Sequence, residues 1–527
     1  MPYRILVTDT LADSGIELLK SDPEVELDYA PGVKGAELLA KVAVAEAVIS
    51  RSGTAITAEL LDAGPNLRVA GRAGVGLDNV DVEAATARGV LVINAPTANI
   101  LSATEHTMAM LLSLCRSIPE ANASVMRGEW TRSKFMGLEL SGKTLGIIGL
   151  GRIGTRVATR AKAFGMTLLA YDPYIPPAAA QKVQAELVDF ERLLKESDFI
   201  TVHTPLTDET RGMIGTDEIA RMKPGVVLVN CARGGIYVES DLAEALNEGR
   251  VAAAAVDVFE VEPPPPDHPF LSAKNIILTP HIGANTVEAQ DRVAVQTAEM
   301  VVAALKGSIF VSAVNLPFEG RADAQVAPLI RLAEKLGLLA SQLLDGPPNE
   351  VVLELWGIEE RFARILSVAS VKGFLSPHLS QTVNFVNALS VAENRGLSTS
   401  TTLHPVPHDY TSLVTFRARS GESEVCVSGT LFSEKQLRVV SVNGFRVEFD
   451  PTGWLIYMVN KDVPGVVGKV GTVLGDREIN IAEYNLARAP EGGKAMAIIT
   501  VDSAIDDVTL SFIKSFKEME DVRLIEV

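Results

Sequence analysis

A glycine-rich hexapeptide at residues 149–154 constrains the fold of this chain more than any other part of its sequence. It directly follows an apolar stretch at 143–148 that is typical of a buried β-strand, and the residues after it favour a helix. In such an arrangement Gly149 permits the tight turn, Gly151 lets a phosphate approach the backbone, and Gly154 lets the helix pack closely on the strand. The first turn of the helix then offers amide donors and a favourable dipole to an anion. The pattern predicts a dinucleotide-binding βαβ unit, with a glycine turn that binds nothing as the alternative.

Short apolar segments alternate with helical segments on both sides of this hexapeptide. Such alternation is typical of parallel sheets with crossover helices. A long apolar helix, expected at 102–118, separates the segments into two series, so we expect two α/β units. The expected strands lie at 5–7, 47–49, 67–71, 90–94, 143–148, 167–171, 199–203, 226–230, 253–256 and 276–278.

A change of composition near residues 317–320 marks the end of the α/β units. Residues 355–450 mix strand-like runs with turn residues and indicate a separate α+β module. From residue 455 onward the pattern predicts strand, helix, strand, strand, helix and strand, which is the order of a ferredoxin-like fold. These six elements are expected at 455–459, 465–474, 479–487, 495–501, 508–516 and 522–525.

The composition limits the cellular setting and the partners. At 527 residues the chain is too long for one hydrophobic core, so three or four domains are expected. Its apolar runs are shorter than the roughly 20 residues of a membrane span, and its first residues turn polar too early for a secretory signal. The widely spaced Cys115, Cys231 and Cys426 argue against a disulfide framework or a metal site and fit a reducing cytoplasm. A net charge of −18 disfavours nucleic acid as a partner.

Asp172 indicates which dinucleotide would bind. It ends the strand that follows the glycine hexapeptide, eighteen residues after Gly154 (172 − 154). A carboxylate at this place can accept hydrogen bonds from the ribose 2′-hydroxyl and repels a 2′-phosphate, which favours NAD over NADP. The alternative is an ordinary turn aspartate, since Pro173 follows.

Three polar residues follow predicted strands at the sheet edge where open α/β folds bind ligands. They are Arg233, Glu262 and His281. Oxidation of a secondary alcohol needs a base for the hydroxyl proton, and a histidine oriented by a carboxylate can serve. We therefore assign His281 as the base, Glu262 as its partner, and Arg233 as the group that binds a carboxylate. A single histidine after a strand is more often structural, so this hypothesis depends on the combination.

The segments around these residues resemble the D-isomer-specific 2-hydroxyacid dehydrogenases. They are Asn-Cys-Ala-Arg-Gly-Gly at 230–235, Asp-Val-Phe-x-x-Glu-Pro at 257–263 and Thr-Pro-His-x-Gly-Ala at 279–284, in the family's order. The resemblance covers residues 1–315 and implies that Arg233, Glu262 and His281 are the catalytic set. NAD contacts are expected from Val75, Gly149, Gly151, Arg152, Ile153, Gly154, Asp172, Thr204, Cys231, Ala232, Arg233, Asp257, His281, Gly283 and Ala284.

The resemblance also implies a domain organisation. We expect a Rossmann-type, doubly wound NAD domain at 99–284, inserted in a flavodoxin-like substrate domain formed by 1–98 and 285–315. An α+β middle domain at 316–450 and a ferredoxin-like domain at 451–527 follow. The family forms dimers, so a homo-oligomer is expected, either a dimer or a tetramer.

Several polar residues indicate the substrate. Two arginines follow strands of the first unit and can face the cleft, and the surrounding segments resemble the members of the family that act on 3-phosphoglycerate. That resemblance implies substrate contacts from Arg51, Ser52, Arg72, Gly74 and Asn99, with Arg132 reaching the site of a neighbouring subunit. Each arginine could instead be a solvated surface charge. The expected reaction converts 3-phosphoglycerate to 3-phosphohydroxypyruvate with NAD, as the first step of L-serine synthesis.

The C-terminal segment resembles an ACT domain, a module that binds amino acids between paired copies. The resemblance implies that L-serine is an effector and that Asn460, Asp462 and Asn480 bind it, although Asn460 stands where some members have histidine. Arg438 and Arg446 could bind an anion in the middle module, but ordinary surface charge is the favoured interpretation.

Two other functions remain open at this stage. A glyoxylate or hydroxypyruvate reductase of the same fold would leave Arg51 and Arg72 without a phosphate to bind. An NADH-sensing corepressor-like interaction protein would not need the ACT-like module. A turnover assay distinguishes the two enzymatic functions from the non-catalytic interaction protein.

Overall fold

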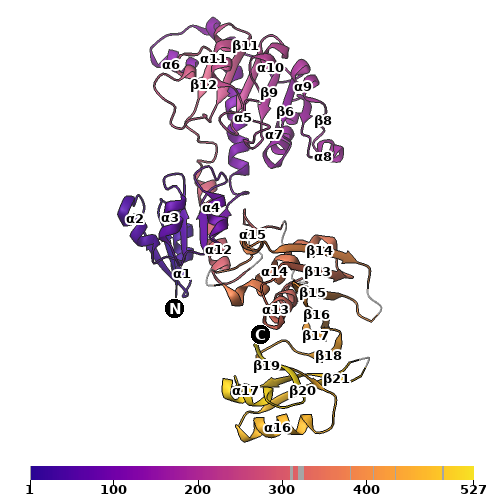
Figure 1. Ribbon diagram of the computed structural model, residues 1–527. Helices are drawn as coiled ribbons and strands as arrows, with labels where there is room; N and C mark the ends of the chain where they lie inside the picture. The colour runs from indigo at the N-terminus through magenta and orange to yellow at the C-terminus, as the bar shows by residue number, and fades with distance from the viewer. Residues whose placement is uncertain are drawn as a thin grey trace.

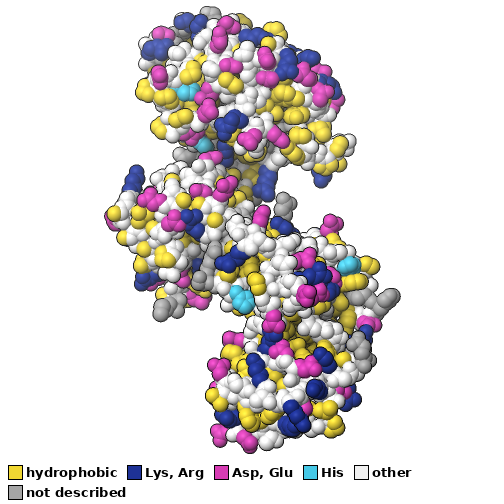
Figure 2. All heavy atoms as spheres, viewed as in Figure 1, with side chains coloured by type: hydrophobic (Ala, Val, Ile, Leu, Met, Phe, Trp, Pro, Cys, Tyr) yellow, Lys and Arg dark blue, Asp and Glu magenta, His cyan; other side chains and the backbone are white. Residues whose placement is uncertain are grey.

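The computed structural model describes residues 2–308, 313–318, 326–379, 382–406, 409–433, 435–489 and 492–527. These residues form four sheets. The molecule is elongated, with the largest sheet at one end and the C-terminal sheet at the other (Figure 1). Basic and acidic side chains are interspersed over the face shown in Figure 2. Within the described residues, no helix is both long and apolar enough to cross a lipid bilayer.

The first sheet is parallel and has the order β2-β1-β3-β4-β5, which is the flavodoxin-like order. Its strands are β1 (Tyr3–Val7), β2 (Val25–Tyr29), β3 (Ala47–Ser50), β4 (Val69–Arg72) and β5 (Leu91–Asn94), with helices α1 (Asp13–Ser21), α2 (Gly35–Val42), α3 (Ala58–Ala63) and α4 (Val82–Ala87). The sequence patterns predicted these strands except β2. That strand lies at the edge of the sheet, and its alternating polar residues hid it among the surrounding loops.

A distant segment completes this first unit. Helix α12 (Val287–Leu305) packs against α1 so closely that a Cβ on Gly15 would stand 2.8 Å from the Cβ of Ala294. Beyond α12, the side chain of Asn315 accepts a hydrogen bond from the backbone N–H of Val92 at 2.9 Å. The chain therefore leaves the first unit after β5, forms the second unit, and returns.

The second sheet is also parallel and has the order β12-β11-β10-β9-β6-β7-β8. Strands β9 and β10 are buried along their whole length, as expected for strands covered by helices on both faces. The chain winds in one direction from β6 to β8 and in the other from β9 to β12, so the strand order reverses between β6 and β9, where a doubly wound sheet binds its ligand. The strands are β6 (Thr144–Ile148), β7 (Thr167–Tyr171), β8 (Glu186–Leu187), β9 (Phe199–Val202), β10 (Val226–Asn230), β11 (Val251–Val256) and β12 (Ile276–Leu278); the helices include α5 (Ile100–Arg116), α6 (Ile118–Met126), α7 (Arg152–Ala163), α8 (Pro177–Lys182), α9 (Phe190–Glu196), α10 (Thr216–Arg221) and α11 (Glu239–Asn247).

The third sheet lies in the middle module and has the order β14-β13-β15-β16-β17-β18. Neighbouring strands in it are antiparallel except β13 and β14, which are parallel. Helices α13 and α14 pack against one another and help to cover the sheet. The elements are α13 (Ala327–Leu343), β13 (Glu350–Trp356), α14 (Ala363–Leu375), α15 (Ala388–Asn394), β14 (Ser398–His404), β15 (Leu413–Ser420), β16 (Ser423–Phe432), β17 (Gln436–Val442) and β18 (Phe445–Phe449).

The C-terminal sheet has the order β20-β21-β19-β22 and carries the predicted ferredoxin-like sequence of elements. One face packs against two helices in a small core of its own. The other face is not separate from the middle module, because Leu455, Tyr457 and Ile498 belong to the same buried cluster as Phe416 and Val427. The elements are β19 (Trp454–Lys461), α16 (Val466–Asp476), β20 (Ile481–Arg488), β21 (Lys494–Val501), α17 (Asp507–Lys514) and β22 (Met519–Glu526).

Polar contacts join the modules at defined points. The side chain of Gln342 on α13 donates to the carbonyl of Glu526 at 2.9 Å, and Arg523 forms an ion pair with Asp345 at 3.0 Å. The middle module reaches the first unit through Asn384, whose side chain donates to the carbonyl of Gly89 at 2.6 Å. Gly89 directly precedes the segment that becomes β5.

Glycine at position 337 allows α13 and α14 to pack at close range. A Cβ there would fall on the carbonyl oxygen of Ser370 on α14. We expect Gly337→Ala to destabilise the protein by about 1–3 kcal/mol, because the rigid backbone must move to make room. Thermal unfolding followed by circular dichroism measures the effect. Gly471→Ala is the matched control, since a Cβ at that helical position meets nothing within 4 Å; equal midpoints for the two variants would refute this account.

Candidate functional site

The C-terminal ends of the strands in the first and second sheets border a common cavity of about 770 Å³. Residues from both sheets line it, so it lies between the two α/β units. The cavity contains most of the residues that the sequence singled out. Its predicted members are Arg51, Ser52, Arg72, Gly74, Val75, Asn99, Ile153, Thr204, Cys231, Ala232, Arg233, Asp257, Glu262, His281, Gly283 and Ala284.

The glycine hexapeptide forms the turn between β6 and α7. Gly149 has a φ of +88°, a left-handed value that favours glycine. A Cβ on Gly154 would fall on the carbonyl oxygen of Gly149, so the close approach of helix and strand requires glycine there. Gly151 instead faces open space, with nothing within 4 Å of a built Cβ. The N-terminus of α7 is therefore accessible to an anion such as a phosphate.

Asp172 lies just beyond β7 and binds the backbone of this turn. One carboxylate oxygen accepts from the backbone N–H of Leu150 at 2.9 Å, and the other accepts from that of Tyr174 at 3.0 Å. These bonds hold the carboxylate beside the glycine turn. Each oxygen retains a lone pair that a ribose hydroxyl could use.

Three polar groups in the cavity wall help to test whether a dinucleotide fits. The hydroxyl of Thr204 is buried and has no hydrogen-bond partner among the described residues. Its neighbour His203 also lines the cavity, and burial lowers the pKa of His203 to about 4, which keeps the ring neutral. Burial raises the pKa of Cys231 to about 12, so that thiol stays protonated. An accessible helix N-terminus, an orphaned hydroxyl and the neutral groups fit a nicotinamide dinucleotide.

His281 and Glu262 form a hydrogen-bonded pair in the cavity wall. The Nδ1 atom of His281 lies 2.7 Å from a carboxylate oxygen of Glu262, and the other oxygen of Glu262 accepts from the backbone N–H of Phe259 at 3.1 Å. The hydrogen bond to Glu262 raises the pKa of His281 above its ordinary value, because it stabilises the imidazolium. Since Nδ1 is engaged, Nε2 is the nitrogen available to exchange a proton.

The buried carboxylate of Asp257 fixes the loop that carries His281. It accepts hydrogen bonds from the backbone N–H groups of Ile282 at 2.9 Å and Gly283 at 2.8 Å, and from the hydroxyl of Thr279 at 2.5 Å. His106 on α5 lies 3.2 Å from the same carboxylate. Burial acts to raise the pKa of Asp257, but these bonds outweigh it and hold the pKa below its ordinary value.

Three arginines, Arg51, Arg72 and Arg233, line the cavity. The Nη2 atom of Arg233 lies 3.1 Å from where a Cβ on Gly76 would stand, so the second unit closely approaches the loop after β4. The guanidinium of Arg72 fills the space beside Gly74, and its buried Nε has no partner in the described structure. Burial lowers the pKa of Arg72, and the positive charges of Arg51 and Arg233 lower it further. A bound anion would offset both the cost of burying the Arg72 charge and its repulsion by Arg51 and Arg233.

Arg51 is positioned by residues that the sequence did not single out. Asp9 accepts a hydrogen bond from its backbone N–H at 2.6 Å, and the side chain of Asn79 donates to its carbonyl at 2.6 Å. Asp9, Asn79 and His106 each contact a segment that is distant in the sequence, so no local pattern revealed these contacts. His203 ends a predicted strand, and the strand-end rule could have found it.

Some predicted residues lie outside this cavity wall. Gly149, Gly151, Arg152, Gly154 and Asp172 belong to the adjoining turn, and the side chain of Arg152 donates to the carbonyl of Pro96 at 3.4 Å. Arg132 is exposed on a short helical turn and does not line the cavity. It follows Trp130, whose exposed fraction is 79%.

The predicted effector residues lie in the C-terminal module. Asp462 forms an ion pair with Arg488 at 3.1 Å, and the side chain of Asn480 donates to Asp502 at 2.8 Å. Asn460 is buried, and its side-chain oxygen has no partner in the described residues.

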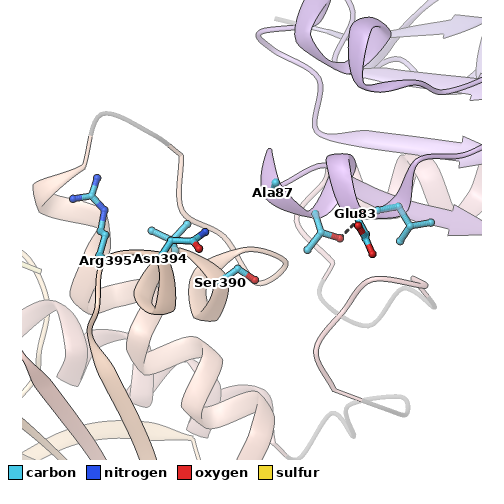
Figure 3. Close-up of a pocket in the computed structure, with 8 residues that line it drawn as sticks. Glu83, Ala87, Ser390, Asn394 and Arg395 are labelled. Carbon is cyan, nitrogen blue, oxygen red and sulfur yellow. Dashed lines mark hydrogen bonds between the residues drawn. The ribbon is translucent and has the colours of Figure 1, made fainter.

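Two other hollows contain none of the predicted catalytic residues. One, of about 570 Å³, lies between α4 and α15, with Glu83 on one side and Ser390, Asn394 and Arg395 on the other (Figure 3). A second, of about 1070 Å³, lies at the N-terminal ends of the strands in the first sheet. Neither has a histidine among the described residues that line it.

Comparison with known protein families identifies two matching segments. The NAD binding domain of D-isomer specific 2-hydroxyacid dehydrogenases matches residues 108–283. The D-3-phosphoglycerate dehydrogenase intervening domain matches residues 325–443.

Curated relatives match the full length of the chain. The D-3-phosphoglycerate dehydrogenase of Bacillus subtilis (strain 168) is 41% identical over 529 residues, covering 100% of both chains. That of Methanocaldococcus jannaschii is 42% identical over 529 residues, covering 99% of this chain and 100% of the relative.

Solved structures match the two α/β units. A D-lactate dehydrogenase from Aquifex aeolicus, complexed with NAD and lactic acid, has a TM-score of 0.52 at 31% identity and covers 57% of this chain and 96% of its own. A glyoxylate reductase from Paecilomyes thermophila has a TM-score of 0.54 at 30% identity and covers 59% of this chain and 98% of its own.

The pair of His281 and Glu262 generates a prediction about protonation. We expect Glu262→Gln to lower the pKa of His281, because a neutral amide stabilises the imidazolium less than a carboxylate does. An NMR titration of histidine-labelled protein measures this pKa, and His281→Asn identifies the resonance. Glu260→Gln serves as the control, since Glu260 is exposed and pairs with Arg211 at 3.5 Å. The same His281 pKa in wild type and Glu262→Gln would contradict the assignment.

Proposed function

Because the chain belongs to the D-3-phosphoglycerate dehydrogenases, within the D-isomer specific 2-hydroxyacid dehydrogenase family, we propose that it oxidises 3-phospho-D-glycerate to 3-phosphohydroxypyruvate with NAD. This reaction is the first step of L-serine synthesis from 3-phosphoglycerate. The observation that carries the proposal is the His281 and Glu262 pair in one cavity with Arg51, Arg72 and Arg233. A proton acceptor thus lies beside a site for a substrate with two anionic groups, a carboxylate and a phosphate.

His281 acts as the base in the oxidation. Its Nε2 atom takes the proton of the C2 hydroxyl, while Glu262 holds Nδ1 and stabilises the imidazolium. Arg233 binds the substrate carboxylate and draws electron density from the forming carbonyl. NAD, when bound, supplies the nicotinamide ring that accepts the hydride from C2. In the reverse direction the raised pKa of His281 favours the protonated ring, which returns the proton.

NAD fits the residues around the glycine turn. The open backbone at Gly151 and the N-terminus of α7 would hold the pyrophosphate. Asp172, held beside the turn by Leu150, would accept from the ribose hydroxyls and repel a 2′-phosphate. The buried Thr204 hydroxyl would gain a partner from the same ligand.

The substrate phosphate would bind Arg51 and Arg72, supported by Ser52, Gly74 and Asn99. This region is cationic within a chain whose net charge is −18, so a local group of arginines is needed to attract an anion. The unpartnered Nε of Arg72 supports this role, because a buried donor without an acceptor is costly.

We also propose a homo-oligomer in which Arg132 contributes to the site of a neighbouring subunit. The segment around it exposes large apolar side chains, with exposed fractions of 81% for Met126, 79% for Trp130 and 90% for Met136. Exposed apolar surface of this kind is typical of a protein interface. Arg132 would enter the neighbouring site from the same segment.

The substrate assignment predicts a difference between phosphorylated and unphosphorylated keto acids. NADH oxidation should be fastest with phosphohydroxypyruvate, and Arg51→Ala should raise KM for it about 10-fold or more, since a charged hydrogen bond contributes about 1.5–3 kcal/mol. KM for hydroxypyruvate should change little. Arg68→Ala is the control, because Arg68 is exposed and precedes β4 at the other end of the strand. Equal rates with hydroxypyruvate or glyoxylate would assign the chain to the reductases of the family.

The assignment of the C-terminal module as an amino-acid-binding domain predicts that L-serine inhibits the enzyme. Asn460, Asp462 and Asn480 would bind the amino acid, with Asp462 exchanging its bond to Arg488 for the ligand ammonium group. Added L-serine should slow turnover, and Asp462→Ala should weaken the inhibition while leaving uninhibited turnover intact. Asp476→Ala, at an exposed position of the same module, should respond like wild type. Serine-insensitive wild-type enzyme would refute the effector assignment without affecting the catalytic one.

A further inference from the structure

Strand β14 forms an open edge of the sheet in the middle module. It pairs with β13 over seven residues, from Ser398 to His404, without a bulge. It is the terminal strand of the sheet, and Figure 1 shows it at the outer side of the module. The opposite edge strand, β18, lies beside β20 of the C-terminal sheet. Within the described residues, β14 is therefore the uncovered edge.

The backbone pattern shows which groups of β14 are free. The N–H of Ser398 donates to the carbonyl of Asn349 at 3.0 Å, and the carbonyl of His404 accepts from the N–H of Gly357 at 3.2 Å. Both residues therefore direct their backbone groups toward β13. Because successive residues of a strand point to opposite sides, Thr399, Thr401 and Leu403 direct their N–H and C=O groups outward. No described residue hydrogen-bonds to these groups.

The composition of β14 does not protect this edge. Natural edge strands usually carry a lysine, a proline or a bulge that prevents another strand from pairing. β14 reads Ser-Thr-Ser-Thr-Thr-Leu-His and contains none of them. Every residue from Ser398 to Leu403 is exposed.

The side chains of β14 that continue the buried face of the sheet are also exposed. Its residues Thr399, Thr401 and Leu403 are in register with Val351, Leu353 and Leu355 of β13. The β13 residues are buried, whereas Leu403 has an exposed fraction of 40%. Helices α14 and α15 approach β14, yet its side chains on this face stay exposed at the edge of the sheet.

We propose that β14 pairs antiparallel with β14 of a second copy of this chain, about a two-fold axis at Thr401. The outward residues are placed symmetrically about Thr401, so Thr399 would face Leu403 of the partner subunit and Thr401 would face its own counterpart. Each of these three pairs exchanges two hydrogen bonds, which gives six. The outward residues Thr399, Thr401 and Leu403 carry uncharged side chains, so the strand meets its own copy without like-charge repulsion. The outward N–H and C=O groups can pair with the same groups of a second copy. The two subunits would then contribute the same surface, which makes the interface isologous.

This contact lies in a different module from the apolar segment at Trp130. The two surfaces can act together, so pairing through both would assemble four chains. The edge pairing does not depend on the catalytic assignments.

Engineered cysteines test the register. In a hydrogen-bonded antiparallel pair the Cα atoms are about 5.5 Å apart, which a disulfide can bridge. Thr401→Cys in the full-length protein should therefore form a covalent dimer on mild oxidation, as seen on a non-reducing gel. Thr402→Cys is the matched control, because the two copies of residue 402 would be diagonal neighbours about 7–8 Å apart. The unmodified chain, with Cys115, Cys231 and Cys426, measures the background.

A proline variant tests the assembly itself. Thr401→Pro removes an outward N–H and leaves the hydrogen bonds to β13 intact. Light scattering on the eluted protein should give half the wild-type mass, with turnover retained as evidence of folding. A dimer crosslinked at 401 and not at 402, together with the halved mass, supports the proposal. No crosslink at 401, equal crosslinking at both positions, or an unchanged mass in the folded proline variant overturns it.

Discussion

The buried carboxylate of Asp257 fixes the geometry of the candidate active site. Its exposed fraction is 1%, and it accepts hydrogen bonds from Thr279, Ile282 and Gly283. A buried charge is costly unless such donors surround it, so the loop cannot move away without leaving the carboxylate unpaired. His281 lies within this loop, and its own N–H donates to the carbonyl of Asp257 at 2.8 Å. The position of the imidazole relative to Glu262 therefore depends on one residue that exchanges no proton with the substrate.

The sequence predicted the fold class and nearly every strand of the α/β units, because buried parallel strands are short, apolar and separated by helices. It missed β2, because an edge strand with polar alternation lacks that signal, and the two-residue strand β8, which is too short to show it. The division at residues 450 and 451 into a middle and a C-terminal domain stays a prediction, and the sequence did not indicate that the two modules share a core. Apolar residues in a strand do not reveal which other sheet covers them, and so this contact could not be read from the sequence.

The candidate site was predictable where function requires a residue at a strand end. Arg233, Glu262 and His281 all follow strands, and the structure brings them into one cavity with Arg51 and Arg72. The supporting residues were not predictable in this way. Asp9, Asn79 and His106 act through contacts between segments that are distant in the sequence. Such contacts follow from the packing of two sheets and leave no local pattern.

The core shared by the middle and C-terminal sheets has a mechanical consequence. Sliding one sheet over the other would expose Leu455, Tyr457 and Ile498 to water, so the two modules resist shear and transmit force as one stiff arm. This arm touches the first unit where Asn384 holds the carbonyl of Gly89. A displacement of the two modules would move Gly89 and the start of β5. The other end of β5 continues through Pro96 to Asn99, which lines the cavity. The arm therefore contacts the first unit at the end of β5 that lies away from the cavity.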